Sequence, residues 1–331
     1  MKKILLITTG GTIASVRTLV GLTPEGENIE ILKYVPEIKE MCDVDTISLF
    51  SLDSTNIYSY HYLKIARTIR ENYDKYDGFV VCHGTDTMAY TASALSYLIQ
   101  DSIKPIVLTG SQKPLNLDIS DGKTNLIDSF VYVLSDNASG VAVVFNGNVI
   151  LGTRARKTRT KSYNAFSSID YPILGIVQDG VYYPYITFNK KETKFYDSMS
   201  DSVGLFKLIP GVSDDIFEYM MNKYDVVVVE SFGVGGLPHY KGSKFYDLVQ
   251  EYTSKGKMVV MTTQVQNEGS DIAIYEVGYS LKKNPNVLES YDMIEEATIT
   301  KLMWILSITH DQKEIRKLFY TTISNDILLA K

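Results

Sequence analysis

The first residues of the chain, MKKILLITTGGTIASVRT (residues 1–18), combine a buried strand with a glycine turn that is followed by a hydroxyl group. The apolar run Ile4–Ile7 has the composition of a strand that is covered on both faces. Gly10 and Gly11 are sufficient to turn the chain sharply, because glycine adopts backbone conformations that other residues avoid. Thr12 is not needed for the turn, so its hydroxyl either caps the next element or takes part in chemistry.

Apolar runs of strand length alternate with helical patterns along the rest of the chain. In the expected helix over residues 88–99, Met88, Ala92 and Leu95 recur three or four residues apart and form one apolar stripe. Such alternation is typical of an α/β fold with a mixed or parallel sheet flanked by helices. The predicted strands of the first half are KILLIT (3–8), TISLF (46–50), GFVVC (78–82), PIVLT (105–109) and VAVVF (141–145), and the predicted helices span residues 60–73, 88–99 and 123–134.

A change of pattern divides the chain, whose 331 residues are long for one core. Residues 182–201 are aromatic and charged without helical or strand periodicity, which indicates a connection between domains. Alternation then resumes with DVVVVES (225–231), a helix over 244–253, KMVVMTT (257–263) and two helices over 294–319. We predict a larger N-terminal α/β catalytic domain at 1–185, a linker at 186–208 and a smaller parallel α/β domain at 209–331.

The composition argues against several kinds of partner. The formal net charge is −6 without a large basic block, whereas nucleic-acid binding requires clustered Lys and Arg. No segment approaches the roughly 18 consecutive apolar residues of a membrane helix, and the N-terminal apolar run is too short for a signal sequence. Cys42 and Cys82 lack the spacing of a zinc or redox motif. We therefore expect a cytoplasmic protein that binds neither nucleic acid nor membranes and has no cysteine-based zinc motif.

Polar, hydroxyl-rich turns follow five of the predicted strands. In open α/β sheets, ligands bind beyond the carboxyl ends of the strands. We therefore expect these turns to form one rim around the functional site. The five turns are TTGGT (8–12), DSTN (53–56), HGTDT (83–87), TGSQKP (109–114) and TTQVQNEGSD (262–271).

Thr85, Asp86 and Lys157 carry the groups that a proton relay requires. A threonine hydroxyl becomes a useful nucleophile only when a neighbour takes its proton, and a lysine can do so when burial lowers its pKa. A nearby carboxylate orients the lysine. Two alternatives remain open, since HGTDT lies where Ser, Thr and Asp cap a helix, and the basic cluster 154–161 also fits a solvated strand edge.

The remaining groups of the rim have several interpretations. Gly10 and Gly11 allow the backbone to approach a substrate and to direct N–H groups at a developing oxyanion. The turn is a weak match to a phosphate-binding loop, because it lacks the lysine of a P-loop and the third glycine of a dinucleotide motif. For His83 we expect a buried structural role, since no second histidine or carboxylate has the spacing of a metal site.

Long motifs at several of these strand ends resemble one known family. TTGGTIAS (8–15), VVCHGTDTMAYTASAL (80–95), TGSQKPL (109–115), SDGKTNL (120–126) and GTRARKT (152–158) are similar to the bacterial L-asparaginase family, above all to its cytoplasmic type I branch. The similarity continues through ESFGVGGLP (230–238) and EATITKLMWIL (296–306). It implies a homodimer or homotetramer of two-domain α/β subunits that hydrolyse the side-chain amide of asparagine to aspartate and ammonia without a metal or cofactor.

The resemblance also implies catalytic roles for individual residues. By motif, Thr12 matches the primary nucleophile, while Thr85, Asp86 and Lys157 match a second triad. Water that is activated through this triad is expected to hydrolyse a β-aspartyl ester. The sequence alone leaves open which threonine attacks first and whether water attacks the amide directly.

Substrate-binding residues follow in the same way. Ser54 and Asp53 match residues that hold the α-carboxylate and α-ammonium of the substrate, with Asp86 also on the ammonium. Gly11 is expected to contact the substrate, and the backbone carbonyl of Ser111 to accept a hydrogen bond from the leaving amide. Asparagine and glutamine are not distinguished, because one methylene contributes only about 1–3 kcal/mol of discrimination.

The segment after TGGTIA departs from the family pattern. There the family has a mobile lid with a tyrosine that hydrogen-bonds the nucleophile, whereas residues 15–30 contain no tyrosine and Leu22 stands in its place. Tyr275, from a neighbouring subunit, is the candidate substitute, and an ordinary packed tyrosine is the alternative. Two other functions stay open: a catalytically weak amino-acid sensor, and the amidohydrolase subunit of a tRNA-dependent amidotransferase.

Overall fold

The computed structural model describes residues 1–18, 21–24, 31–189, 191–274 and 276–328. The chain divides into two compact units, Met1–Asp197 and Ser198–Lys331. This division falls within the predicted linker, residues 186–208. Part of that segment is regular structure, because Lys194–Phe195 forms strand β14 of the first unit and Val203–Lys207 forms strand β15 of the second.

The first unit is built on a mixed sheet. Its described residues form eight strands in the order β13-β12-β9-β8-β7-β5-β1-β4. Neighbours from β4 to β8 are parallel, and the pairs that involve β9, β12 and β13 are antiparallel. The strands are β1 (Lys3–Gly10), β4 (Asp43–Leu52), β5 (Gly78–Cys82), β7 (Pro105–Thr109), β8 (Gly140–Phe145), β9 (Asn148–Leu151), β12 (Gly175–Gln178) and β13 (Val181–Pro184).

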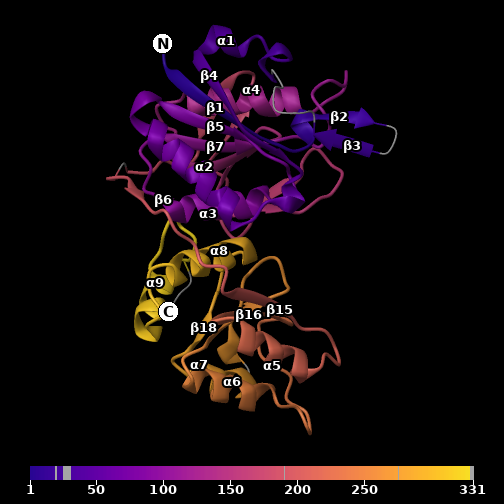
Figure 1. The fold of residues 1–331 in the computed structure, drawn as a ribbon, viewed down its shortest axis with the longest axis vertical. Coiled ribbons are helices and arrows are strands. Elements are labelled where there is room, and N and C mark those ends of the chain that lie inside the picture. Colours follow the sequence, from indigo (N-terminus) through magenta and orange to yellow (C-terminus); the bar gives the residue numbers. More distant parts are fainter. Residues whose placement is uncertain (19–20, 25–30, 190, 275, 329–331) are drawn as a thin grey trace. The chain divides into compact units, whose positions relative to one another are not determined.

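Helices cover both faces of this sheet (Figure 1). Side chains alternate between the faces of a strand, so Ile4 and Leu6 of β1 pack in one core cluster with Ile38 and Phe130. Those two partners come from the helices α1 and α4 on that face, and α2 and α3 lie on the other face (Figure 1). The helices are α1 (Ile38–Met41), α2 (Ser59–Asn72), α3 (Met88–Leu98) and α4 (Gly122–Val133).

Short strand pairs complete the first unit. The hairpin β2–β3 follows the end of β1 and projects beyond the sheet (Figure 1). A second antiparallel pair, β10–β11, follows β9, and β14 pairs with β6. Their bounds are β2 (Ser15–Thr18), β3 (Gly21–Pro24), β6 (Ile99–Gln100), β10 (Ala155–Lys157) and β11 (Phe166–Ser168), and 3-10 turns occupy η1 (Thr12–Ala14), η2 (Ile31–Lys33), η3 (Ser54–Asn56) and η4 (Tyr73–Lys75).

The second unit is a smaller α/β unit on a parallel sheet of four described strands, in the order β15-β16-β17-β18. Its core includes the rings of Phe206, Phe217 and Phe245, whose centroids lie 5.2 to 6.2 Å apart. The elements are β15, α5 (Asp214–Lys223), β16 (Val226–Ser231), α6 (Phe245–Ser254), β17 (Met258–Thr263), η5 (Ile272–Ile274), α7 (Glu276–Lys282), β18 (Val287–Glu289), α8 (Glu295–Leu306) and α9 (Gln312–Tyr320).

The predicted fold class is confirmed: a larger mixed sheet flanked by helices and a smaller parallel α/β unit. Among the described residues, no helix has both the length and the apolar character that a membrane span needs.

Candidate active site

The carboxyl ends of β4, β1, β5 and β7 lie side by side at one edge of the large sheet. Gly10 at the end of β1 pairs with Leu52 at the end of β4. The N–H of Gly11 donates to the carbonyl of Leu52 at 2.9 Å, and the N–H of His83 donates to the carbonyl of Thr109 at 2.8 Å. Four of the five predicted turns therefore meet at this edge.

The fifth predicted turn, TTQVQNEGSD (262–271), belongs to the second unit. It follows β17, which pairs with β16 and β18 in the sheet of the second unit. The prediction that all five turns follow strands of one sheet is wrong, because the apolar run that precedes this turn belongs to the four-stranded sheet.

Two glycines bring three of the remaining turns into close contact. Gly11 has a φ of +79°, and a Cβ placed on it would lie 2.4 Å from the Cα of Gly84. A Cβ on Gly84 would lie 2.6 Å from both the Cβ and the Oγ of Ser54. Neither space holds a side chain, since carbon atoms in contact are about 3.5–4.0 Å apart. Thr12 and Thr85, which directly follow the two glycines, are therefore held on adjacent turns.

The turn after β1 differs in one respect from its predicted role. The N–H of Gly11 already donates to Leu52, so it does not point at an oxyanion, and the contribution of Gly11 is close packing. Thr12 begins the 3-10 turn η1 and is half-buried. Within the part of the chain that the structure describes, the Thr12 hydroxyl makes no hydrogen bond.

Thr85, Asp86 and Lys157 are in direct contact. The Nζ of Lys157 donates to Thr85 Oγ1 at 2.8 Å and to Asp86 Oδ1 at 2.5 Å. Thr85 is 5% exposed, whereas the side chain of Asp86 is 57% exposed. The cap interpretation of this turn is wrong, because the residue that precedes α3 is Thr87, whose hydroxyl donates instead to the carbonyl of Ser54.

The hairpin β10–β11 supplies Lys157. Lys157 pairs with Phe166, whose ring packs 5.1 Å from that of Phe145 on the large sheet. Arg154, just before β10, is fully buried, with its guanidinium 5.5 Å from the ring centroid of Tyr171. The start of the basic cluster is therefore anchored in the core, and the lysine extends from a fixed strand.

His83 has a structural role. Its Nδ1 donates to the carbonyl of Gly84 at 2.7 Å, because a carbonyl can only accept, and its Nε2 accepts from the Thr91 hydroxyl at 2.8 Å. Burial lowers the pKa of His83 to about 4, so the ring is neutral at pH 7. Both ring nitrogens are used, and the ring fixes the turn that carries Thr85.

Two family models match most of the chain. The model "Asparaginase, N-terminal" matches residues 3–188, and the model "Glutaminase/Asparaginase C-terminal domain" matches residues 202–319. The chain belongs to the asparaginase family.

Individual relatives of this asparaginase-family chain point the same way. It is 38% identical to L-asparaginase of Thermococcus kodakarensis over 98% of this chain and 99% of that protein. The solved structure of the Thermococcus enzyme superposes with a TM-score of 0.92 at 36% identity, covering 99% of this chain and all of that one. L-asparaginase 1 of Escherichia coli is 34% identical over 96% of this chain and 95% of that protein, in agreement with the type I resemblance.

A relative with another name is also similar. A glutamyl-tRNA(Gln) amidotransferase component of Pyrococcus horikoshii is 34% identical over 97% of this chain and 76% of that protein.

The predicted substrate-binding residues occupy different environments in this family member. Asp53 is exposed, and its Oδ1 accepts from the N–H of Thr55 at 2.9 Å and from its hydroxyl at 3.0 Å. Ser54 is 2% exposed and packs against Gly84. The hydroxyl of the buried Ser111 donates to the carbonyl of Lys113 at 2.5 Å, so its side chain serves its own turn.

The turn after β7 is held by two residues, Asp121 and Asn125, that had no predicted role. The carboxylate of Asp121 accepts from the N–H of Gln112 at 2.9 Å and from that of Lys113 at 3.0 Å. Asn125 donates to the carbonyl of Gly110 at 3.0 Å. Asp121 and Asn125 belong to the motif SDGKTNL, four residues apart around the start of α4, and this spacing was the available signal.

Two predictions about the lid concern residues that the structure describes only in part or not at all. The backbone of Leu22 belongs to β3 and pairs with Arg17. The side chain of Leu22 and all of Tyr275 lie outside the described residues.

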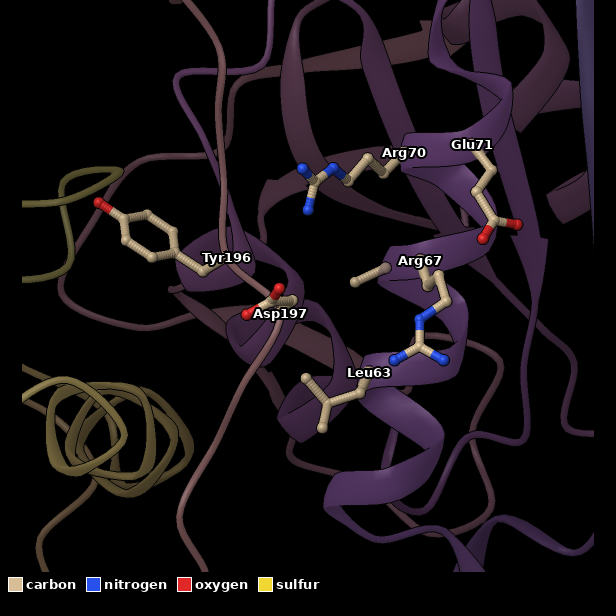
Figure 2. A pocket seen from close by; sticks show the side chains of 7 residues that line it. Leu63, Arg67, Arg70, Glu71, Tyr196 and Asp197 are labelled. Atoms are coloured by element: carbon tan, nitrogen blue, oxygen red, sulfur yellow. The ribbon is translucent and has the colours of Figure 1, made fainter.

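A separate pocket of about 370 Å³ lies against α2. Figure 2 shows Arg67 and Arg70 extending from α2 beside this hollow, with Tyr196 and Asp197 across from them. None of the predicted site residues lines it.

Proposed function

We propose that this asparaginase-family hydrolase converts L-asparagine to L-aspartate and ammonia. The observation that carries the proposal is the contact of one lysine, Lys157, with a buried threonine hydroxyl and a carboxylate. The backbone contact between Gly11 and Gly84 supports a second threonine, Thr12, facing the same substrate. Similarity to two proteins named L-asparaginase supports the choice of substrate.

The proposed reaction has two steps. Thr12 Oγ1 bonds to the amide carbon of the substrate, the carbon–nitrogen bond breaks, and the Thr12 proton leaves on nitrogen as ammonia. Water then attacks the resulting β-aspartyl ester while Thr85 and Lys157 remove its proton, and the proton is returned to Thr12 as the ester bond breaks. Acid–base assistance of this kind contributes about 10²–10⁴ in rate.

The proposal also assigns residues that bind the charged α-ammonium and α-carboxylate of free asparagine. Asp53 and Asp86 are acidic groups for the α-ammonium, and both are exposed enough to receive a ligand. Ser54 binds the α-carboxylate, the close-packed Gly11 contacts the substrate from the neighbouring turn, and the Ser111 carbonyl accepts from the leaving amide.

The test is ammonia release by the purified chain from asparagine and from glutamine, each over a range of concentrations. We expect turnover of asparagine, and a loss of about 10²-fold or more in Thr12→Ala with folding unchanged. Thr68→Ala is the matched control, because its hydroxyl donates to the carbonyl of Lys64 on its own helix, α2. If Thr12→Ala turns over asparagine at the wild-type rate, Thr12 is not the nucleophile.

The relative named as an amidotransferase component supports a second candidate, in which this chain releases ammonia for transfer to glutamyl-tRNA. The same assay separates the candidates. Rapid turnover of free asparagine by the chain alone supports the hydrolase, dependence on a partner and tRNA supports the transferase, and binding without turnover supports a sensor.

We also propose a cytoplasmic homodimer or homotetramer. The family resemblance supports the assembly, and the free, buried thiols of Cys42 and Cys82 fit a reducing compartment. Light scattering checks the assembly against the chain mass of 37.2 kDa, where a monomer counts against it. Cell fractionation checks the location.

A further inference from the structure

The side chain of Gln112 links Thr85 to the hairpin that carries Lys157. This side chain lies in the turn after β7, between Thr85 and the loop of the hairpin that supplies Lys157. The Thr85 hydroxyl donates to Gln112 Oε1 at 3.4 Å, and Gln112 Nε2 donates to the carbonyl of Ser162 at 3.2 Å.

These partners allow one arrangement of protons. The carbonyl of Ser162 can only accept, so the amide nitrogen of Gln112 faces it and the amide oxygen faces Thr85. That oxygen can only accept as well, so the Thr85 proton points at Gln112. A lone pair of Thr85 Oγ1 is then left for the Nζ of Lys157, which donates at 2.8 Å.

The backbone of Gln112 is fixed independently of this side chain. Asp121, which is 7% exposed, accepts from the N–H groups of Gln112 and Lys113. Asp121 also accepts from the side-chain amide of Asn125 at 3.2 Å. The Gln112 side chain therefore starts from a rigid turn and can set the orientation of what it touches.

We propose that Gln112 is a positioning residue for the hydrolysis reaction, and this inference rests on the proposed function. Gln112 holds Thr85 in the χ1 rotamer that presents the hydroxyl, rather than the methyl group, to Lys157. It also ties the 158–165 loop to the Thr85 turn. Because Gln112 acts through Thr85, its loss lowers kcat and leaves KM nearly unchanged.

The first test is Gln112→Met, which keeps the length of the side chain and removes both hydrogen-bonding groups. A hydrogen bond contributes about 0.5–1.5 kcal/mol net, so kcat is expected to fall by about three- to tenfold. Gln312→Met is the matched control, because that amide donates to two backbone carbonyls, of Thr253 and Lys257, in the second unit. Equal kcat values for the two variants overturn the proposal. Should Gln112→Met not fold, Gln112→Asn, one methylene short of Thr85, takes its place with the same expectation.

A double-mutant cycle then identifies the route of the effect. In a Thr85→Ala background, Gln112→Met is expected to lower kcat by less than about twofold, because the group it positions is gone. A full, additive loss in that background means that Gln112 acts elsewhere and overturns the proposal.

The second test does not depend on turnover. Methyl-labelled threonine reports the Thr85 rotamer by NMR coupling constants in the wild type and in Gln112→Met. We expect one rotamer in the wild type and averaging in the variant, and a single unchanged rotamer in both overturns the inference. If the wild type releases no ammonia from either amide, the proposed function fails, while this measurement still decides whether Gln112 positions Thr85.

Discussion

Gly84→Ala tests whether close backbone approach builds the site. Gly84 does not have a left-handed backbone conformation, so alanine brings no backbone strain, and the whole effect comes from the added methyl group. That carbon would lie 2.6 Å from Ser54 Cβ and 3.3 Å from Gly11 Cα. Rotation of the Ser54 side chain about χ1 does not move its Cβ, so the clash persists.

The size of the effect follows from these distances. Relief of the contact with Ser54 needs a shift of about 1 Å, because carbon atoms pack at about 3.5–4.0 Å. Overpacking of this kind costs about 1–3 kcal/mol of folding free energy. A displacement of about 1 Å in a catalytic group costs about 10²-fold in rate. Both losses are expected together.

The assays are ammonia release from asparagine and urea unfolding. Gly180→Ala is the matched control, because a Cβ there meets no atom of the described residues within 4 Å and the φ of +74° makes alanine costly. We expect that control to lose about 1 kcal/mol of stability with its turnover unchanged. Turnover by Gly84→Ala within about threefold of the wild type would refute the argument that close approach positions the two threonines.

Three further predictions concern buried charges. The lowered pKa of His83, about 4 against 6.5 when unfolded, means that the unfolded chain gains the proton first. The free energy of unfolding should therefore fall by up to about 3 kcal/mol as pH drops from 6.5 to 4, and urea titrations should show a shallower fall in His83→Gln. Asp128 has the opposite sign, since burial raises its pKa from 3.8 to about 6. The free energy of unfolding therefore falls as pH rises through that range. The free energy of unfolding of Asp128→Asn, compared with that of the wild type, should be higher at pH 7 than at pH 4. An equal difference between variant and wild type at both pH values would contradict this prediction. Lys301→Met should lower the free energy of unfolding by about 3–5 kcal/mol, because it removes the counter-charge of Asp326 from a fully buried ion pair of 2.6 Å. A loss below about 1 kcal/mol would contradict that reasoning.

Long apolar strands were predictable because a strand that is buried on both faces has an unbroken run of apolar residues in the sequence. The runs in β1, β5 and β16 needed no knowledge of their partners. The antiparallel part of the sheet was missed, although two turn signals were present. Asn146-Gly147 and Asp179-Gly180 join β8 to β9 and β12 to β13 with positive φ at both residues, as two-residue hairpins require.

The candidate site was predictable only as a set of residues. Thr85 and Lys157 are 72 positions apart, and no spacing rule brings them together. Their contact depends on the fold of the β10–β11 hairpin, whose first strand was visible in the sequence only as part of the basic cluster 154–161. Gln112 and Asp121 were missed because their roles arise from tertiary contacts.

The rate of ammonia release by Lys157→Met tests the central claim most directly, with Lys161→Met, an exposed neighbour, as the control. We predict that Lys157→Met loses about 10²–10⁴ in kcat and still binds aspartate, because the relay loses its amine while the binding turns remain. Equal kcat values for the two variants would contradict the account.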